Sequence, residues 1–397
     1  MSEILNVPEL FGSDVFNEAT MKVCLPEHVF HAWKTCVSTG SQLPLDIANE
    51  IAEAMKVWAI SKGATHYTHW FQPMTGITAE KHDSFISPTG DGRVIMEFSG
   101  TELVKGESDG SSFPNGGLRA TFEARGYTAW DPTSCAFVKD GSLYIPTCFF
   151  SYTGESLDKK TPLLRSMDEV SREALRILRL FGDTETKRVI ASVGAEQEYF
   201  LLPKDLYNQR EDLRLTGRTL FGAQPPKGQE LDDHYFGTIR TRVSSFMKDL
   251  DEQLWRLGIL SKTKHNEGAP CQHEMAPIYT DANTACDDNQ LIMEIMKKCA
   301  AKHNLVCLLH ESPSPGSTVP VSTTTGLWQQ IPAKICSLPA KPPARTPGSC
   351  CSLPPSWLVW MNIRIFCAAP WHLPETTTVW AAVRLLLPLF PFSWVPN

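Results

Sequence analysis

Two glutamates separated by one residue lie in a run of strand-forming residues. Glu196 and Glu198 belong to the segment GAEQEYFLL. Side chains two positions apart on a β-strand point to the same face, so the two carboxylates are predicted to lie side by side. Neighbouring carboxylates repel, and at least one is driven toward protonation unless a cation lies between them. An exposed strand face also often carries Glu-x-Glu, and this segment alone does not decide between the two interpretations.

A second pair of acids, Glu267 and Glu274, lies in the segment KHNEGAPCQHEMAP. The Gly-Ala-Pro break between them predicts two short strands joined by a turn, with both acids at one end of a sheet. Four carboxylates in two such groups suit a hard cation with oxygen ligands, Mg²⁺ or Mn²⁺. Such cations usually bridge phosphates in phosphoryl transfer. His265 and His273 are also available, but a lone histidine is more often structural than a ligand.

The same segment has a faint similarity to the zinc deaminase signature H-x-E…P-C-x-x-C, through His265, Glu267 and Cys271. The two halves of the signature are too close together here, and Glu274 stands where the second cysteine should fall. A zinc deaminase site is therefore rejected.

A glycine- and serine-rich loop, ESDGSSFPNGGLR at residues 107–119, contains Asp109. Taken alone, it is most simply interpreted as a solvated turn. The chain has no complete GxxxxGK[ST] or GxGxxG phosphate-binding motif, so a standard nucleotide-binding fold is not supported.

The elements that must position these residues include both helices and strands. Residues 44–62 have the spacing of an amphipathic helix, with Gly63 suited to its C-terminal cap. Residues 64–155 are rich in turns and β-forming runs, and a domain boundary is expected near residues 156–162. Beyond that boundary, alternating strands and helices indicate an α/β or α+β domain.

The second part of the chain has its own start and stop signals. Ser166 and Glu169 match a capping box, which predicts a helix from there through Phe181 that Gly182 ends. Residues 187–193 are expected to lead a strand into GAEQEYFLL. Residues 236–257 and 283–309 predict two long amphipathic helices.

Composition excludes several classes of protein. The 397 residues carry a net charge of −7 with no basic stripe, which argues against nucleic-acid binding. The N-terminus has no basic segment followed by an apolar run, and the cysteines of residues 1–311 form no CxxC pair, so a cytoplasmic protein with reduced thiols is expected. The apolar run at residues 379–395 contains Arg384 and two prolines, so no membrane span is expected.

Together these segments resemble glutamine synthetase, specifically the large bacterial type III class. The resemblance covers residues 8–311, in the order of that class. It rests on the segments ATHYTHWFQPMTGITAEKHDSF (64–85), GESDGSSFPNGGLR, WDPTSCAF, GAEQEYFL, GAQPPKGQELDDHYFG and HNEGAPCQHEMAPIY. Gly268 and Cys271 depart from it, because Val and Ala are expected there.

The resemblance implies an α+β fold: an N-terminal β-grasp-like domain (1–158), the first part of a catalytic α/β domain (159–311), and homo-oligomeric rings with active sites between subunits. It also implies synthesis of glutamine from glutamate, ammonia and ATP with Mg²⁺ or Mn²⁺. By motif match, Glu198, Glu267 and Glu274 resemble ligands of a first metal and Glu196 a ligand of a second. Asp109 resembles the residue with which a neighbouring subunit binds and deprotonates ammonium, and Ser112 is a candidate for substrate binding.

The composition changes abruptly at residue 312. Residues 312–397 contain one acid, Glu375, against five bases, and 15 of the 29 prolines. If one base was lost from the coding sequence after Glu311, restoring it shifts the reading frame of residues 312–328. Their codons can then be translated as KPFAGVNGSGKHNNWSV, the sequence that the resembled family should have at this place. Tryptophan has a single codon, so Trp371 and Trp380 each determine the next residue of the shifted frame. Both of those residues also fit the family sequence. We hypothesise that 312–397 is an out-of-frame tail that is not natively folded; the alternative is a genuine proline-rich extension.

The in-frame sequence should carry an NGSGKH segment for glutamate and the second metal, and NDHRLG and later arginines for phosphate and glutamate. Without them the chain is expected to be inactive, and its open sheet edges to promote aggregation. A non-catalytic assembly or binding protein of the same fold is the alternative, but such a protein has no reason to keep like charges crowded. A glutamate–cysteine ligase or guanidino kinase of the same superfamily is disfavoured by the 107–119 loop and the 64–85 segment.

Overall fold

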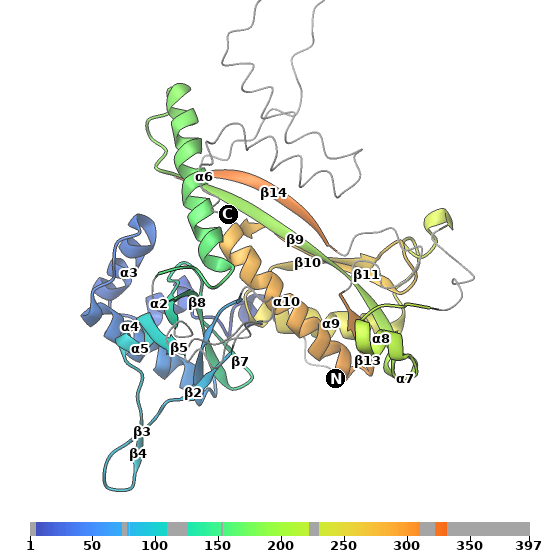
Figure 1. Cartoon of the computed structure of the whole chain (residues 1–397), viewed down its shortest axis with the longest axis horizontal. Helices are drawn as coiled ribbons and strands as arrows, with labels where there is room; N and C mark the ends of the chain where they lie inside the picture. Colours follow the sequence, from blue (N-terminus) through green and yellow to red (C-terminus); the bar gives the residue numbers. More distant parts are fainter. Residues whose placement is uncertain are drawn as a thin grey trace, which may run out of the picture. The chain divides into compact units, whose positions relative to one another are not determined.

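The computed structural model describes residues 5–73, 78, 80–108, 126–151, 154–221, 230–309 and 322–331, excluding the side chains of residues 107, 108, 230 and 322–331. All of these residues belong to the first of two compact units. They form two six-stranded, mostly antiparallel sheets with helices packed against them (Figure 1). The α+β class expected from the sequence is confirmed.

The N-terminal part begins with four helices and continues with a sheet. The helices are α1 Val7–Leu10, α2 Glu18–Cys24, α3 Glu27–Thr39, α4 Leu45–Ser61 and, later, α5 Gly100–Val104. The helix predicted over 44–62 is α4, and Gly63 follows it with the positive φ of +86° that a C-terminal glycine supplies. Ile51 and Met55 on its inner face are fully buried.

The first sheet has the strand order β2-β1-β8-β6-β5, with β7 also paired to β8. Its strands are β1 His66–Trp70, β2 His82–Ser84, β5 Lys105–Ser108, β6 Gly126–Trp130, β7 Phe137–Lys139 and β8 Ser142–Ser151, and β3 Ile86–Pro88 pairs with β4 Val94–Met96 as a separate hairpin. The β1–β8 pair is parallel and the remaining pairs are antiparallel. For the described residues among 64–155, the strand-rich interpretation is thus correct apart from α5.

The second part contains the helices α6 Lys160–Leu180, α7 Lys204–Asn208, α8 Glu211–Thr216, α9 Thr241–Arg256 and α10 Ala282–Lys302, and the 3₁₀ turn η2 Glu230–Asp232. The capping box predicted at Ser166 and Glu169 is wrong, because α6 starts six residues earlier. The carboxylate of Asp158 accepts a hydrogen bond from the Thr161 amide (3.2 Å) in the first turn. Ser166 instead lies within the helix, and its hydroxyl donates to the carbonyl oxygen of Leu163 (2.7 Å).

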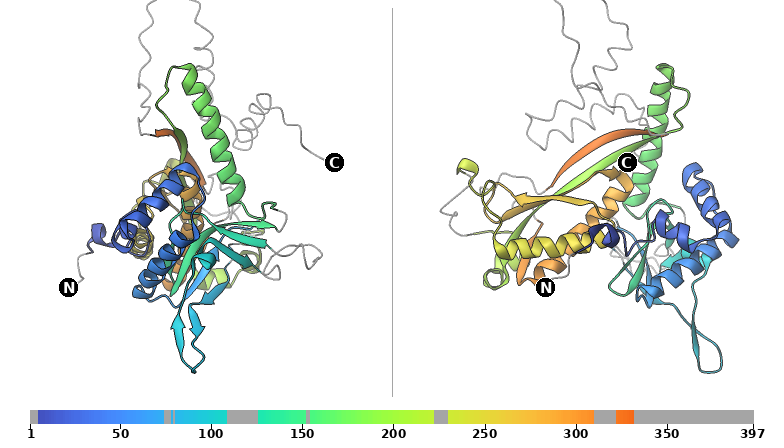
Figure 2. Two further views of the ribbon diagram at one scale, coloured as in Figure 1. Left: turned by 90° about the vertical axis from the view of Figure 1, so that its left-hand side faces the viewer. Right: turned by 180° about the vertical axis from the view of Figure 1, so that it is seen from behind.

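The central strand of the second sheet is β9 Arg188–Pro203, which is 16 residues long and includes GAEQEYFLL as predicted. Its partners are β11 Gln272–Pro277, β12 Thr280–Asp281, β13 Leu305–Leu308 and β14 Ser322–Ile331, and β10 Ser261–Asn266 pairs with β11. All of these pairs are antiparallel. The strand β14 runs alongside β9 from Arg188 to Gln197 (Figures 1 and 2).

Two predicted helices are shorter than expected. The first is α9, which starts at Thr241 rather than at 236 because Arg240 is extended. The second is α10, which ends at Lys302 rather than at 309, and Asn304 then turns the chain with a φ of +53°. The apolar run that follows forms β13, because β9 offers it a free edge; a short apolar run does not by itself distinguish a helix end from a strand.

The helices α9 and α10 pack on the second sheet through a buried core. Its fully buried members include Tyr199 of β9, Phe246 of α9 and Met296 of α10. No helix of the described residues combines the length and apolar character that crossing a membrane requires.

Candidate metal centre

Three neighbouring strands place acidic side chains opposite one another. Glu198 of β9 is the cross-strand partner of Glu274 of β11, and Glu274 is in turn the partner of His265 of β10. Directly opposed residues on antiparallel strands point to the same face, with Cβ atoms about 4.5–5.5 Å apart. The register therefore forms a row of two carboxylates and an imidazole across the sheet.

The turn between β10 and β11 adds a third carboxylate. Glu267 follows the last residue of β10, and its amide donates to the carbonyl oxygen of Gln272 (3.0 Å), which closes the turn. Cys271 takes up the left-handed conformation, with φ of +65°. The strand–turn–strand arrangement expected from the Gly-Ala-Pro break is present, with Glu267 and Glu274 at its two ends.

His265 lies between the two carboxylates of this turn. Its Nδ1 is 3.4 Å from an oxygen of Glu267, and its Nε2 is 3.2 Å from an oxygen of Glu274. One ligand atom from each of the three residues lies within 4.8 Å of the other two. We call Glu196, Glu198, Glu267 and Glu274 the glutamate cluster, and His265 is the imidazole in contact with it.

Glu198 is the most deeply buried acid of the cluster, with 3% exposure. Its carboxylate accepts a hydrogen bond from Nε2 of Gln272 (2.7 Å), which fixes one oxygen. Glu196 is two residues earlier on β9, half-buried, and opposite Thr323 of β14. The alternation of the strand puts Glu196 on the same face as Glu198, as the sequence predicted.

The surroundings of the Glu274 carboxyl disfavour its charged form. Burial raises the pKa of Glu274, and the nearby carboxylates of Glu267 and Glu196 raise it further, whereas His265 acts in the opposite direction. Within the described part of the chain, no lysine or arginine forms an ion pair with Glu267 or Glu274, and both carboxylates pair with His265. The donors are carboxylate oxygens, which suit a hard cation such as Mg²⁺ or Mn²⁺.

A second layer of side chains fixes the turn from the other side of the sheet. His273 bonds to Oδ1 of Asn266 through Nδ1 (2.9 Å), and Asn266 donates to the carbonyl oxygen of Gly237 (3.1 Å). Nδ1 of His234 lies 2.6 Å from the backbone oxygen of Glu267. Burial lowers the pKa of His273 to about 3, helped by His234 and Arg240, so this histidine is neutral and structural.

The sequence analysis treated His265 and His273 alike, although strand alternation was enough to predict which of them faces the glutamates. His265 precedes Glu267 by two positions and shares its face, whereas His273 is adjacent to Glu274 and faces the other way. Asp109 and Ser112, the remaining predicted site residues, lie outside the described residues.

Comparison with known proteins identifies two matching families. Residues 7–166 match the family described as "Glutamine synthetase type III N terminal", and residues 172–318 match "Glutamine synthetase, catalytic domain". A type-3 glutamine synthetase of Dictyostelium discoideum is 51% identical over 313 residues, which cover 78% of this chain and 43% of that protein. A glutamine synthetase of Bacteroides fragilis is 52% identical over 308 residues, covering 78% of this chain and 42% of that protein.

Among solved structures, the chain resembles the glutamine synthetase of Plasmodium falciparum with a TM-score of 0.48 and 16% identity, over 68% of this chain and 53% of that one. The chain thus spans less than half the length of the curated relatives that it matches.

Proposed function

The chain belongs to the glutamine synthetase family, and from that premise we propose that its glutamate cluster holds the divalent cations of an ATP-dependent glutamate–ammonia ligase. Glu198, Glu267 and Glu274 would hold a first Mg²⁺ or Mn²⁺, and Glu196 a second. The observation that carries the proposal is the row of carboxylates from β9 and β11 with the turn acid Glu267 beside it. When bound, such ions neutralise the charge of the phosphoryl group that passes from ATP to the γ-carboxylate of glutamate.

The residues of the chain prepare this site before any ligand arrives. The hydrogen bond from Gln272 holds one oxygen of Glu198 and so limits the rotation of its carboxylate. His265 bridges Glu267 and Glu274 and moderates their repulsion. Anchoring of the turn through Asn266 and His234 keeps Glu267 at the end of β10. Preorganised acids of this kind reduce the cost of arranging charge during the reaction.

Asp109 and Ser112 complete the proposed reaction. We assign Asp109 to the general base that takes a proton from ammonium, so that ammonia can attack the γ-glutamyl phosphate. Ser112 in the same loop would contact substrate. In the family pattern, the Asp109 loop reaches the site of a neighbouring subunit, so the proposal includes a homo-oligomeric ring in the cytoplasm.

The tail, residues 312–397, decides whether this chain can carry out the ligase reaction. The catalytic-domain match ends at residue 318, close to residue 312, where the composition changes. Residues 322–331 pair with β9 through backbone groups, which any sequence without proline can supply, and Pro332 follows directly. We therefore keep the proposal that the segments for glutamate and phosphate are out of frame beyond residue 311, and that the chain as written does not ligate ammonia.

Two proteins test this proposal together: the chain as written, and a version whose coding sequence has one base restored after the codon of Glu311. ATP-dependent formation of glutamine from glutamate and ammonium is measured for both with Mg²⁺ and with Mn²⁺. We expect activity only from the restored version. Activity of the chain as written near that of a full-length relative would disprove the role of the tail. A restored protein that folds and binds Mn²⁺ but forms no glutamine would favour the non-catalytic binding protein.

A further inference from the structure

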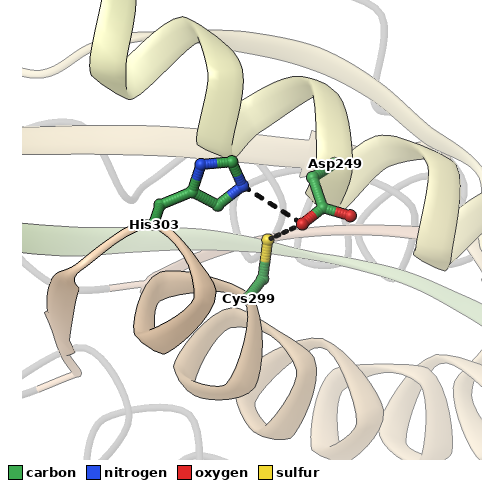
Figure 3. A group of neighbouring side chains, drawn as sticks. All are labelled: Asp249, Cys299 and His303. Carbon is green, nitrogen blue, oxygen red and sulfur yellow. Dashed lines mark hydrogen bonds and ion pairs between the residues drawn. The ribbon is translucent and has the colours of Figure 1, made fainter.

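A second group of metal-binding side chains lies on helices α9 and α10. Asp249 comes from α9, whereas Cys299 and His303 come from the last turn and the C-terminal cap of α10. Figure 3 shows the three side chains pointing toward one another across the two helices. One carboxylate oxygen, the sulfur and one ring nitrogen lie within 4.8 Å of one another.

The helical repeat and the helix packing bring these residues together. Cys299 and His303 are four positions apart, so their side chains are neighbours on one face of α10. The two helices are held against each other by buried apolar residues, among them Phe246 and Leu250 of α9 and Met296 of α10. The convergence is therefore fixed by the fold and does not depend on the hydrogen bonds within the group.

The two distances to the Asp249 carboxylate are close to those that a tetrahedral ion imposes. Oδ2 of Asp249 is 3.2 Å from Sγ of Cys299 and 3.1 Å from Nε2 of His303. Bond lengths of about 2.3 Å to sulfur and 2.1 Å to nitrogen and oxygen place such atoms about 3.6 and 3.4 Å apart around zinc. The two distances to Oδ2 of Asp249 are thus a few tenths of an ångström shorter than those around zinc.

The surroundings orient the carboxylate and leave a path for the ion. Nε2 of Gln253 donates to Oδ1 of Asp249 (2.8 Å), which leaves Oδ2 directed at the other two groups. Such outer hydrogen bonds fix metal ligands in known sites. Cys299 is fully buried, whereas the side chains of Asp249 and His303 are 33% and 24% exposed. An ion can therefore enter from solvent past these two side chains and reach the sulfur at the base of the group.

Sulfur and imidazole donors distinguish this group from the glutamate cluster. Mg²⁺ takes oxygen ligands, whereas thiolate and imidazole favour zinc and similar metals. We propose that Asp249, Cys299 and His303 bind a zinc-type divalent cation, with water as fourth ligand, and that this ion ties α9 to α10. On binding, the Cys299 thiol gives its proton to solvent and its sulfur bonds to the ion, so carboxylate and thiolate together balance two positive charges.

The test uses the full chain, reduced and stripped of metal, titrated with Co²⁺ in excess Mg²⁺. Thiolate coordination to Co²⁺ gives a charge-transfer absorption band in the near ultraviolet, and Zn²⁺ should remove the band by displacing Co²⁺. We expect the band in the parent chain and its loss in Cys299→Ser. Cys286→Ser, at an exposed cysteine of the same helix, is the matched control and should retain the band.

Two further variants keep the proposal testable if Cys299→Ser fails to fold. His303→Gln should lower the affinity for Zn²⁺ by at least tenfold, because losing a ligand costs no less than the ~10–100-fold of an outer-sphere change. Gln253→Ala keeps all three ligands and should lower the affinity by about tenfold. Absence of the band from a folded parent chain, or its persistence in Cys299→Ser, would overturn the proposal, since the three residues would then form only a hydrogen-bonded link.

Discussion

Two groups of buried carboxylates in this chain are neutralised in different ways. In the first, which we call the Lys160 cluster, the ammonium group of Lys160 lies between Asp131 and Asp287. In the second, the glutamate cluster, Glu267 and Glu274 form ion pairs with the imidazole of His265. The two aspartates are thus paired with a permanently charged ammonium group, and Glu267 and Glu274 with a histidine.

The Lys160 cluster is complete in itself. Nζ of Lys160 is 3.0 Å from Asp131 and also bonds to Asp287, whose carboxylate accepts from Ser134 (2.6 Å). Asn283 donates to the other acid, Asp131 (2.7 Å). Burial alone would lower the pKa of Lys160, but the two carboxylates raise it above its ordinary value. These contacts join the segment directly after β6 to α6 and α10, so the cluster is structural.

The cation that accompanies a group of buried acids indicates whether the group is structural or functional. A fold that buries acids for stability supplies a cation of its own, because an uncompensated buried charge costs several kcal/mol. A fold that crowds acids around a titratable imidazole, as at Glu267 and Glu274, accepts that cost where an external cation is to bind, and this favours a metal site there.

The largest effect is expected from removing the internal cation. Lys160→Met leaves Asp131 and Asp287 buried without their partner and should lower the free energy of unfolding by about 3–5 kcal/mol. Urea unfolding followed by circular dichroism measures the change. Lys298→Met is the control, because Lys298 is 48% exposed in its ion pairs with Asp140 and Glu294, and surface pairs contribute about 1 kcal/mol or less. Equal losses in both variants would remove the distinction between the clusters.

The next effect concerns the external cation. Mn²⁺ at about 100 times its dissociation constant should stabilise the chain by about 2.7 kcal/mol, because it binds only the folded state. Glu274→Gln should abolish most of that stabilisation, whereas Glu173→Gln on α6 should not. Thermal unfolding with and without Mn²⁺ measures both. Full stabilisation of Glu274→Gln by Mn²⁺ would show that the ion binds elsewhere.

Sequence patterns predicted the two pairs of glutamates because the members of each pair are close together in the sequence. Strand alternation placed Glu196 and Glu198 on one face, and the Gly-Ala-Pro break placed Glu267 and Glu274 at the two ends of one turn. Both patterns act within a few residues, where backbone geometry alone decides the direction of a side chain.

The Lys160 cluster was not foretold, because its members are far apart in the sequence. Asp158 and Lys160 belong to the stretch 156–162, where a domain boundary was expected from polar residues, and both are almost fully buried. Lys160 finds its partners 29 residues earlier and 127 residues later, which no local pattern specifies. The same holds for the joining of Asp249 to Cys299 and His303, of which only the spacing within α10 was visible in the sequence.

Asp288 is a further carboxylate next to the Lys160 cluster, but it forms no described ion pair with Lys160. Burial raises the pKa of Asp288 to about 8, helped by Asp287 and Asp281. A raised folded-state pKa means that the protonated group favours folding below its unfolded pKa of 3.8, and that this stability is lost as the pH rises through about 8.

Asp288→Asn should therefore stabilise the chain increasingly between about pH 4 and pH 9. At the upper end of this range we expect the free energy of unfolding to rise by about 2 kcal/mol. This is less than half of what the full pKa shift would give at ~1.36 kcal/mol per pKa unit, because the carboxyl is partly exposed. Urea midpoints at several pH values measure it. Asp46→Asn is the control, because it makes the same chemical change at an exposed carboxylate of α4. A difference for Asp288→Asn that does not change with pH would show that this carboxyl is ionised throughout.

The smallest expected effect is a change in the free energy of unfolding that has opposite signs in the two clusters. With divalent ions removed by a chelator at neutral pH, Glu274→Gln should raise the free energy of unfolding by up to about 1 kcal/mol, because it removes one of two opposed like charges. Asp287→Asn should lower it, because Lys160 then loses a charged partner. Since burial and its neighbours raise the pKa of Glu274, the gain from Glu274→Gln should shrink as the pH falls toward the ordinary value of 4.5, where the wild-type carboxyl is increasingly protonated. If both substitutions destabilise the metal-free chain alike, the glutamate cluster is a structural network like that of Lys160, and crowded acids there no longer argue for a metal.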